Sequence, residues 1–275
     1  MRPPPRVGDH PLPAPRIFTP EYYKRMRDLE EGLWWNAGMR DVAALLLHLA
    51  RLPPDGVLLD VGCGSGQTMT WFERGHPGWR AVGIDVASEG LAAARDRGVN
   101  AVARASALEL PFRSESVDLV ITLDVLQHVP LGGGDTRALA EIARVLKPGG
   151  YVFVRTNAQA FPHTPDDLAF QFHKYRPQEL NAKLAAAGLR VIRLSRVNAV
   201  LGLAEIPREL RVRKQEHSYH GILAEPRTAS RLSSRLKRGW LRWEGWVVRR
   251  GGRWPLGRTI VALCQRYGAG PRGDH

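Results

Sequence analysis

Cysteine is scarce in this 275-residue chain, which has only Cys63 and Cys264. Two widely separated cysteines cannot build the disulfide framework of a small secreted domain, so the composition fits a reducing compartment. Long hydrophobic runs are also missing, since no run reaches the roughly 18 apolar residues that a membrane-spanning helix needs. Residues 1–16 are rich in proline and arginine and lack the apolar segment of a secretory signal. From these absences we expect a cytoplasmic protein with one principal core.

Acidic residues are few, and the formal net charge is +13. The excess is concentrated between Arg208 and Arg258, where fourteen Lys or Arg stand against four Glu. Such a segment can be a solvated basic face or a site for an anionic partner, and composition alone leaves both open. The amphipathic order of arginine and tryptophan within it fits a cap over a pocket or a helix on a membrane surface. An RNA-binding motif with interleaved aromatics is absent, so nucleic acid is the less favoured partner.

Glycine occurs at alternate positions after an apolar run at 57–61, as Gly62, Gly64 and Gly66. A buried strand that leads into such a loop and then a helix brings backbone N–H groups close to a ligand. A dinucleotide fingerprint would require a further glycine or alanine at position 67, which is Gln67. Asp60 directly before the loop would repel a pyrophosphate but suits a ligand with an amino group and a sulfonium. This pattern points to S-adenosylmethionine.

A second apolar run, at 81–84, ends in Asp85, where a carboxylate can accept both hydroxyls of a ribose. With these two stretches the chain resembles the class I S-adenosylmethionine-dependent methyltransferases, in particular a ubiquinone-biosynthesis-like subgroup. Further stretches of the resemblance, in the family's order, are 110–112 (LPF), 117–120 (VDLV), 126–128 (LQH) and 146–150 (LKPGG). The resemblance implies an α/β, Rossmann-like, doubly wound sheet of seven strands with an antiparallel last strand.

The resemblance also implies which residues hold the cofactor. The expected set is Asp60, Gly62, Cys63, Gly64, Gly66, Asp85, Val86, Ser106, Ala107, Thr122 and Leu123. One member departs from the family, because Ser106 stands where an acid usually accepts from the adenine amino group. A hydroxyl is still an acceptor, so adenine recognition is weakened and not excluded.

Around this core we expect further segments. Residues 1–18 are predicted to be a disordered tail, 19–52 a helical lid, 53–198 the cofactor-binding core, 199–255 an inserted basic helical cap, 256–267 the final strand and 268–275 a loose tail. Within the lid, helices are predicted over 22–31 and 39–52. In the cap, Leu232, Leu236, Trp240, Trp243 and Val247 fall at helical spacing and are predicted to face inward over the acceptor. The final strand is expected to pair antiparallel at the sheet edge.

Candidate acceptor-site residues follow the strands predicted at 117–123 and 151–155. His128 is the best general-base candidate because an imidazole titrates near neutral pH, although a purely structural role is equally compatible with the sequence. Candidate substrate-binding residues are Trp34, Trp35, Asp124, Gln127, His173, Tyr175, Trp240 and Trp243. The two N-terminal tryptophans could instead simply dock a helix onto the core. No histidine or acidic spacing matches a common metal motif, so no metal is expected.

These features predict an enzyme that transfers a methyl group from S-adenosylmethionine to an oxygen or nitrogen, less favourably a carbon, of a small-molecule metabolite. Two alternatives remain open: an RNA or other nucleic-acid methyltransferase that uses the basic segment, and a catalytically silent protein that binds S-adenosylmethionine. No motif specifies the acceptor or an oligomeric state.

Overall fold

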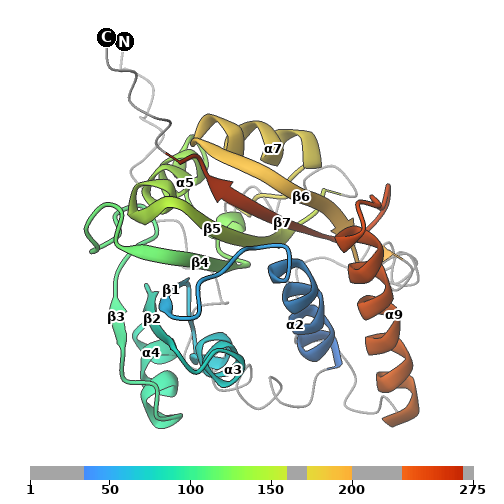
Figure 1. Cartoon of the computed structure of the whole chain (residues 1–275), viewed down its shortest axis with the longest axis horizontal. Coiled ribbons are helices and arrows are strands. Elements are labelled where there is room, and N and C mark those ends of the chain that lie inside the picture. The colour runs from blue at the N-terminus through green and yellow to red at the C-terminus, as the bar shows by residue number, and fades with distance from the viewer. Residues whose placement is uncertain (1–33, 160–171, 200–230, 269–275) are drawn as a thin grey trace, which may run out of the picture.

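A single mixed sheet of seven strands forms the centre of the molecule in a computed structural model, which describes residues 34–159, 172–199 and 231–268 (Figure 1). The strands are β1 (Gly56–Val61), β2 (Trp79–Asp85), β3 (Val102–Arg104), β4 (Val117–Leu123), β5 (Leu146–Asn157), β6 (Leu189–Val197) and β7 (Thr259–Arg266). Their order is β3-β2-β1-β4-β5-β7-β6, and β1 to β5 pair in parallel. This is the predicted Rossmann-like arrangement.

Helices cover both faces of the sheet (Figure 1). On one face lie α2 (Trp34–Leu47), α3 (Gln67–Gly75), α4 (Ser88–Asp96) and α9 (Arg231–Arg249), and the other face is covered by α5 (Gly134–Val145) and α7 (Pro177–Ala186). A short 3₁₀ helix, η2 (Leu126–His128), follows β4. Alternate residues of the strands enter the two cores: Leu58 packs with α2 and α3, whereas Leu59 packs with α5 and α7. Burial on both faces explains the continuous apolar runs of the central strands.

The last strand is antiparallel, as predicted, but its place in the sheet was predicted wrongly. β7 lies between β5 and β6 and pairs antiparallel with both, so β6 is the edge strand. The burial of β7 agrees with this central place, because Ile260 to Cys264 are fully buried. A run of apolar residues without alternation indicates a strand covered on both faces, which an edge position does not require.

The helix before β1 begins earlier than predicted, at Trp34 instead of Met39, and ends at Leu47. The predicted helix over 22–31 lies outside the described residues. α2 packs side by side and parallel with α9, since a Cβ on Gly38 would meet Leu241 and one on Gly245 would meet Val42. Close approach at these two glycines joins the segment before the core to the segment inserted after β6.

The predicted inward face of α9 is wrong. Leu241, Glu244 and Val248 are buried against the rest of the molecule, whereas Leu232 and Leu236 are exposed. Trp240 and Trp243 are partly exposed, with Trp240 Nε1 bonded to the buried Glu244 and the centroid of the Trp243 ring 5.3 Å from that of Trp254. The core-facing stripe of α9 therefore contains Leu241 and Val248. It is not the stripe of larger side chains that the sequence indicated.

Candidate functional site

The glycine loop between β1 and α3 adopts a backbone conformation that residues with a side chain disfavour. Gly62, Gly64 and Gly66 have φ values of 78°, 49° and 74°, in the left-handed region that favours glycine. A Cβ on Gly62 would lie 2.2 Å from Val125 Cγ2, so this position also lacks the space for a side chain. The Gly62 and Cys63 amides both donate to the Ile84 carbonyl, which fastens the loop to β2.

Asp85 at the end of β2 holds the same loop from the side. Its Oδ2 accepts a hydrogen bond from the Gly64 amide at 2.9 Å, and its Oδ1 accepts one from the Ala87 amide at 2.9 Å. The side chain is nearly buried, and burial raises its pKa while these amide donors oppose the shift. Each carboxylate oxygen retains acceptor capacity for a hydroxyl. The neighbouring Val86 is exposed at the rim.

Asp60 is a buried carboxyl group beneath the loop. Burial, reinforced by the charge of Asp85, raises its pKa to about 7, and the charge of Arg155 opposes this rise. Its Oδ2 is buried without a hydrogen-bond partner in the described part of the chain, and so is Thr122 Oγ1 on β4. A buried acceptor normally has a donor. These two orphaned oxygens beside the loop of three left-handed glycines fit a bound group that brings its own donors, as the ammonium of S-adenosylmethionine would.

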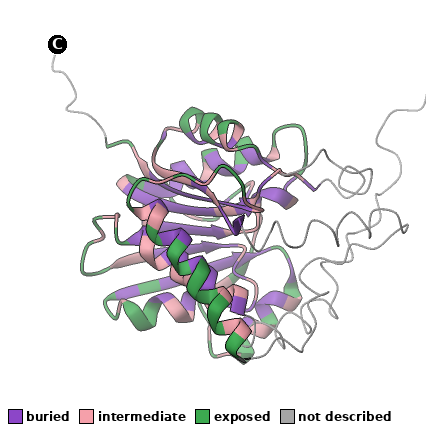
Figure 2. Cartoon of the chain, turned by 90° about the vertical axis from the view of Figure 1, so that its right-hand side faces the viewer, coloured by how far each residue is buried: buried purple, intermediate pink, exposed green. Residues whose placement is uncertain are grey.

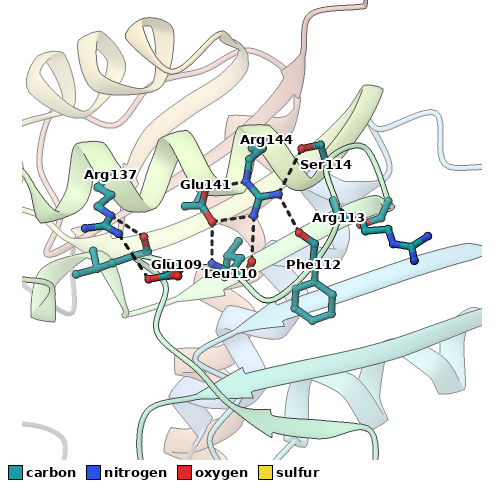
Figure 3. Close-up of polar contacts among 10 residues, drawn as sticks. Glu109, Leu110, Phe112, Arg113, Ser114, Arg137, Glu141 and Arg144 are labelled. Atoms are coloured by element: carbon teal, nitrogen blue, oxygen red, sulfur yellow. Dashed lines mark hydrogen bonds and ion pairs between the residues drawn. The ribbon is translucent and has the colours of Figure 1, made fainter.

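The segment that carries Ser106 and Ala107 is clamped to α5 (Figure 3). Arg144 donates to the carbonyls of Leu110 and Phe112 at 3.0 and 2.8 Å, and Glu141 accepts from the Leu110 amide at 2.8 Å. The Arg144 hydrogen bond lowers the pKa of Glu141, which keeps this pair charged.

Within the clamped segment, Ser106 Oγ accepts from the Leu108 amide at 3.2 Å, and Ala107 is buried. The serine hydroxyl therefore already supports the turn that it begins. It can still donate its own hydrogen or accept a second bond.

An ion pair that the sequence did not indicate lies where β4 and β5 end. Asp124 has a φ of 60°, and its Oδ2 accepts from Arg155 Nη2 at 2.5 Å and Nε at 3.0 Å. The Arg155 guanidinium also lies over the Trp35 ring, 4.7 Å from its centroid. Nothing local in the sequence marks Arg155 as the partner of Asp124, because the two residues are 31 positions apart.

A small crevice opens beside this ion pair, lined by Met39, Arg40, Ala43, Thr68, Trp71, Ile121, Leu123 and Arg155. Arg40 donates to Gln67 Oε1 at 2.5 Å across the gap between α2 and α3. The predicted residue Leu123 therefore lines the same crevice as Arg40 and Arg155, and Arg155 links this crevice to Asp124 and Trp35.

His128 lies in η2, one residue beyond Gln127. Its ring packs against Phe172, with 5.1 Å between centroids. Burial lowers the pKa of His128 to about 4, although the charge of Asp124 acts in the opposite direction. The imidazole is therefore neutral above about pH 5 and can accept a proton. Gln127 itself is buried and bonded to the Thr156 hydroxyl and the Asn157 amide, which leaves its carbonyl oxygen occupied.

Tyr175 was predicted to contact substrate, and this is wrong. Its side chain is fully buried, and its hydroxyl donates to the Leu126 carbonyl at 2.9 Å or to Asp135 at 3.1 Å. His173 forms a 2.8 Å contact with Glu179 and packs on the Tyr175 ring. Both residues thus brace η2 against α7.

Side-chain ligand atoms of Asp135, His173 and Glu179 lie within 4.8 Å of one another. Asp135 already holds the Lys183 ammonium at 3.0 Å, and this cation lowers the pKa of the carboxyl group. Lys183 therefore balances the negative charge of Asp135 in this cluster.

The predicted aromatic substrate contacts divide into two groups. Trp34 is buried at the start of α2 beneath the Lys237 ammonium, 5.1 Å from the ring centroid. Trp240 and Trp243 contact each other on α9, and Trp240 Nε1 donates to Glu244 at 2.6 Å. Both rings are partly exposed, and the prediction that they contact substrate stays a prediction.

Comparison with known proteins gives a family match over the part of the chain that contains the glycine loop. Residues 59–154 match the family described as "Methyltransferase domain". A tRNA (carboxymethyluridine(34)-5-O)-methyltransferase of Arabidopsis thaliana is 33% identical over 106 residues, which are 38% of this chain and 25% of that protein. An uncharacterized protein of Methanocaldococcus jannaschii is 31% identical over 142 residues, 51% of this chain and 52% of that one. The chain thus spans from about a quarter to a half of these relatives' lengths.

Solved structures share the fold. Phosphoethanolamine N-methyltransferase 2 of Haemonchus contortus, in complex with S-adenosyl-L-methionine, has a TM-score of 0.62 at 16% identity, covering 92% of this chain and 58% of that one. A complex of the Haloferax volcanii Trm112 methyltransferase activator with a putative methyltransferase gives a TM-score of 0.58 at 18% identity, covering 93% and 98%. At these identities the likeness concerns the fold alone.

Proposed function

Because the chain carries a class I S-adenosylmethionine-dependent methyltransferase domain, we propose that the whole protein transfers a methyl group from this cofactor to an oxygen or nitrogen of a small molecule. The observation that carries the proposal is the buried, unpartnered Asp60 Oδ2 beneath the loop of left-handed glycines. A catalytic cofactor site needs such pre-formed acceptors, whereas a purely structural turn does not.

When bound, S-adenosylmethionine supplies an electrophilic methyl group on a sulfonium. Asp60 would accept from its ammonium, Asp85 from its ribose hydroxyls, and the Ser106 and Ala107 segment would meet its adenine. The Gly62, Cys63, Gly64 and Gly66 backbone would lie against it, with Val86, Thr122 and Leu123 completing the walls. What these residues contribute is alignment, which can supply roughly 7–11 kcal/mol of a two-molecule barrier.

We place the acceptor at Trp35, Asp124 and Arg155, next to η2. Arg155 lines the crevice and bonds to Asp124 through Nε and Nη2, so a carboxylate or phosphate of the acceptor would bind at the remaining Nη1 or replace Asp124. His128 is the proposed base, because its neutral imidazole lies in η2, shortly after Asp124, and would take the proton that an O–H or N–H nucleophile loses. Burial lowers its pKa to about 4, so it is a weaker proton acceptor than an ordinary imidazole. A cytoplasmic location is part of the same proposal.

RNA is the second candidate acceptor, favoured by one specific observation. Relatives of the cofactor core are named as tRNA methyltransferases, including a probable tRNA methyltransferase 9B of Homo sapiens that is 35% identical over 101 residues. That match covers 37% of this chain and 21% of the human protein. Because the shared part is confined to the core, it supports the cofactor more strongly than the acceptor.

The test is incubation of the protein with methyl-labelled cofactor and, separately, a small-metabolite fraction and total tRNA. Label in a molecule below roughly the size of a nucleotide, identified by mass, would support the proposal. Label in tRNA alone would establish the RNA alternative. Tight cofactor binding with no label in either fraction would support the silent alternative. Arg155→Lys is the matched variant: it keeps the positive charge that acts on Asp60, so cofactor binding should persist, but it loses the planar guanidinium, so acceptor turnover should fall.

A further inference from the structure

The helix α9 has a second apolar face that points away from the core. Its exposed apolar residues and their exposed fractions are Leu232 (68%), Leu236 (67%), Trp243 (45%), Trp246 (42%) and Trp240 (36%). Figure 2 shows the helix toward the viewer, with exposed residues along its length. Exposed apolar side chains are in unfavourable contact with water that a partner would remove, so a contiguous row of them marks an interaction surface.

Positive charge borders this outer face. The helix contains six Lys or Arg, and its one acidic residue, Glu244, is fully buried. Arg235 and Arg242 lie two turns apart, both exposed, on the flank of the row. Within the described chain neither has a carboxylate partner. Arg250, just beyond the helix, stacks on Trp246 with 4.2 Å from its guanidinium carbon to the ring centroid.

We propose that the outer face of α9 binds the surface of an anionic phospholipid bilayer. An interfacial helix needs apolar residues that enter the headgroup region and cations that meet negative lipids, and α9 presents both on one side. Tryptophan suits this boundary because its ring is apolar while its N–H stays hydrated. The helix lies on the surface and does not cross it: no described helix is both long and apolar enough for a membrane span.

Other occupants fit the same face less well. A second copy of the chain would bring the arginine flank against its own equivalent across a two-fold axis, and like charges repel. A single-stranded RNA could stack on the tryptophans and neutralise the arginines. RNA would make no favourable contact with Leu232 and Leu236, the two most exposed apolar residues of the helix.

The experiment is sedimentation of the full chain with vesicles of phosphatidylcholine alone or with about 30% phosphatidylglycerol, an anionic content typical of charged leaflets. One variant removes apolar contact (Leu232→Ser with Leu236→Ser), and a second removes charge (Arg235→Gln with Arg242→Gln). The matched control, Arg95→Gln with Arg113→Gln, removes two exposed arginines elsewhere. Circular dichroism confirms that each variant is folded.

We expect binding to anionic vesicles and little to neutral ones. Either α9 variant should bind anionic vesicles at least about tenfold more weakly, while the affinity of the control should change less than about twofold. The reason is that an arginine adds to the binding free energy only where it lies close to the anionic lipid. No binding to anionic vesicles, or an equal loss in the control variant, overturns the proposal. So does binding to RNA that falls with the arginine variant but not with the leucine variant. None of these readouts depends on methyl transfer, so the outcome is separate from that of the proposed function.

Discussion

Asp60 sits beside Asp85 near the ends of adjacent parallel strands, and burial together with the negative charge of Asp85 raises the pKa of Asp60 to about 7. The ligand-free protein therefore binds a proton at Asp60 that its unfolded chain releases near the ordinary carboxyl pKa. The bound proton stabilises the folded state fully below pH 3.8, and this contribution is lost as pH rises through about 7. A cationic ligand group at Asp60 would replace the proton.

Asp60→Asn should therefore change the pH dependence of stability. Between pH 6 and 8 the wild type should lose on the order of 1 kcal/mol of unfolding free energy through this group, and the variant should not. Urea unfolding at both pH values, without cofactor, measures the difference between the two proteins. Parallel losses in wild type and variant would show that Asp60 does not titrate in this range.

Asp85→Ala should weaken cofactor binding strongly. The variant loses two charge-assisted hydrogen bonds to ligand hydroxyls, each worth on the order of 1.5–3 kcal/mol. It also releases the Gly64 amide that Asp85 now holds. Isothermal titration calorimetry with S-adenosylmethionine checks the effect, and exposed Asp55→Ala is the control. Unchanged affinity in a folded Asp85→Ala variant would refute the assignment of this residue.

His128 itself should add no pH dependence to the rate between pH 5 and 8, because burial lowers its pKa to about 4 and it is already deprotonated there. Saturating cofactor keeps the titration of Asp60 near pH 7 out of this comparison. If it acts as the base, His128→Ala should lower turnover by roughly 10²–10⁴ without weakening cofactor binding. Steady-state rates across this pH range, for wild type and variant, provide the measurement. A variant that turns over normally would leave His128 as a packing partner of Phe172.

Arg144→Gln should loosen the segment that begins at Ser106. The guanidinium bonds to the Leu110 and Phe112 carbonyls and to Glu141, so its removal frees the loop from α5 (Figure 3). Because the group is partly exposed, we expect only about 1 kcal/mol of lost cofactor affinity. Calorimetry beside the neighbouring Arg113→Gln, a charge-matched control, tests this. Equal effects of both variants would attribute the loss to net charge.

The cofactor end of the molecule could be predicted because its signals are local. Gly62, Gly64 and Gly66 mark a left-handed backbone, and the apolar runs of β1, β2 and β4 mark buried parallel strands. The acceptor end depends on pairs that are distant in sequence. No pattern links Asp124 to Arg155, or the Tyr175 hydroxyl to Asp135, so the first pair was missed and the role of Tyr175 was wrong.

The face of α9 was mispredicted for a different reason. The helix carries two apolar stripes, and size favours the one with Trp240 and Trp243. The buried stripe contains Gly245, whose added Cβ would lie 3.1 Å from Val42 Cγ2, so the absence of a side chain allows α2 to approach closely. It also contains a charged residue, which a hydrophobicity pattern assigns to solvent.

That residue, Glu244, gives the last prediction. Its carboxylate is fully buried and accepts from the Asn198 amide at 2.5 Å, the Ala199 amide at 3.0 Å and Trp240 Nε1 at 2.6 Å. Glu244→Ala leaves three donors without this acceptor, and each buried unsatisfied group costs about 1–3 kcal/mol. We expect a loss of at least about 3 kcal/mol of unfolding free energy, measured by urea unfolding and far-UV circular dichroism.

Glu244→Gln separates hydrogen bonding from packing, because it preserves the side-chain shape but turns an NH₂ group toward one of the amide donors. It should lose less than Glu244→Ala and still be less stable than wild type. Glu109→Ala, at a side chain that is 85% exposed, serves as the control and should change stability by less than about 0.5 kcal/mol. A glutamine variant as stable as wild type would mean that the carboxylate's charge contributes nothing. An alanine variant as stable as wild type would show that other contacts, such as those of Leu241 and Val248 and the Arg238–Asp41 ion pair, hold α9 without this carboxylate.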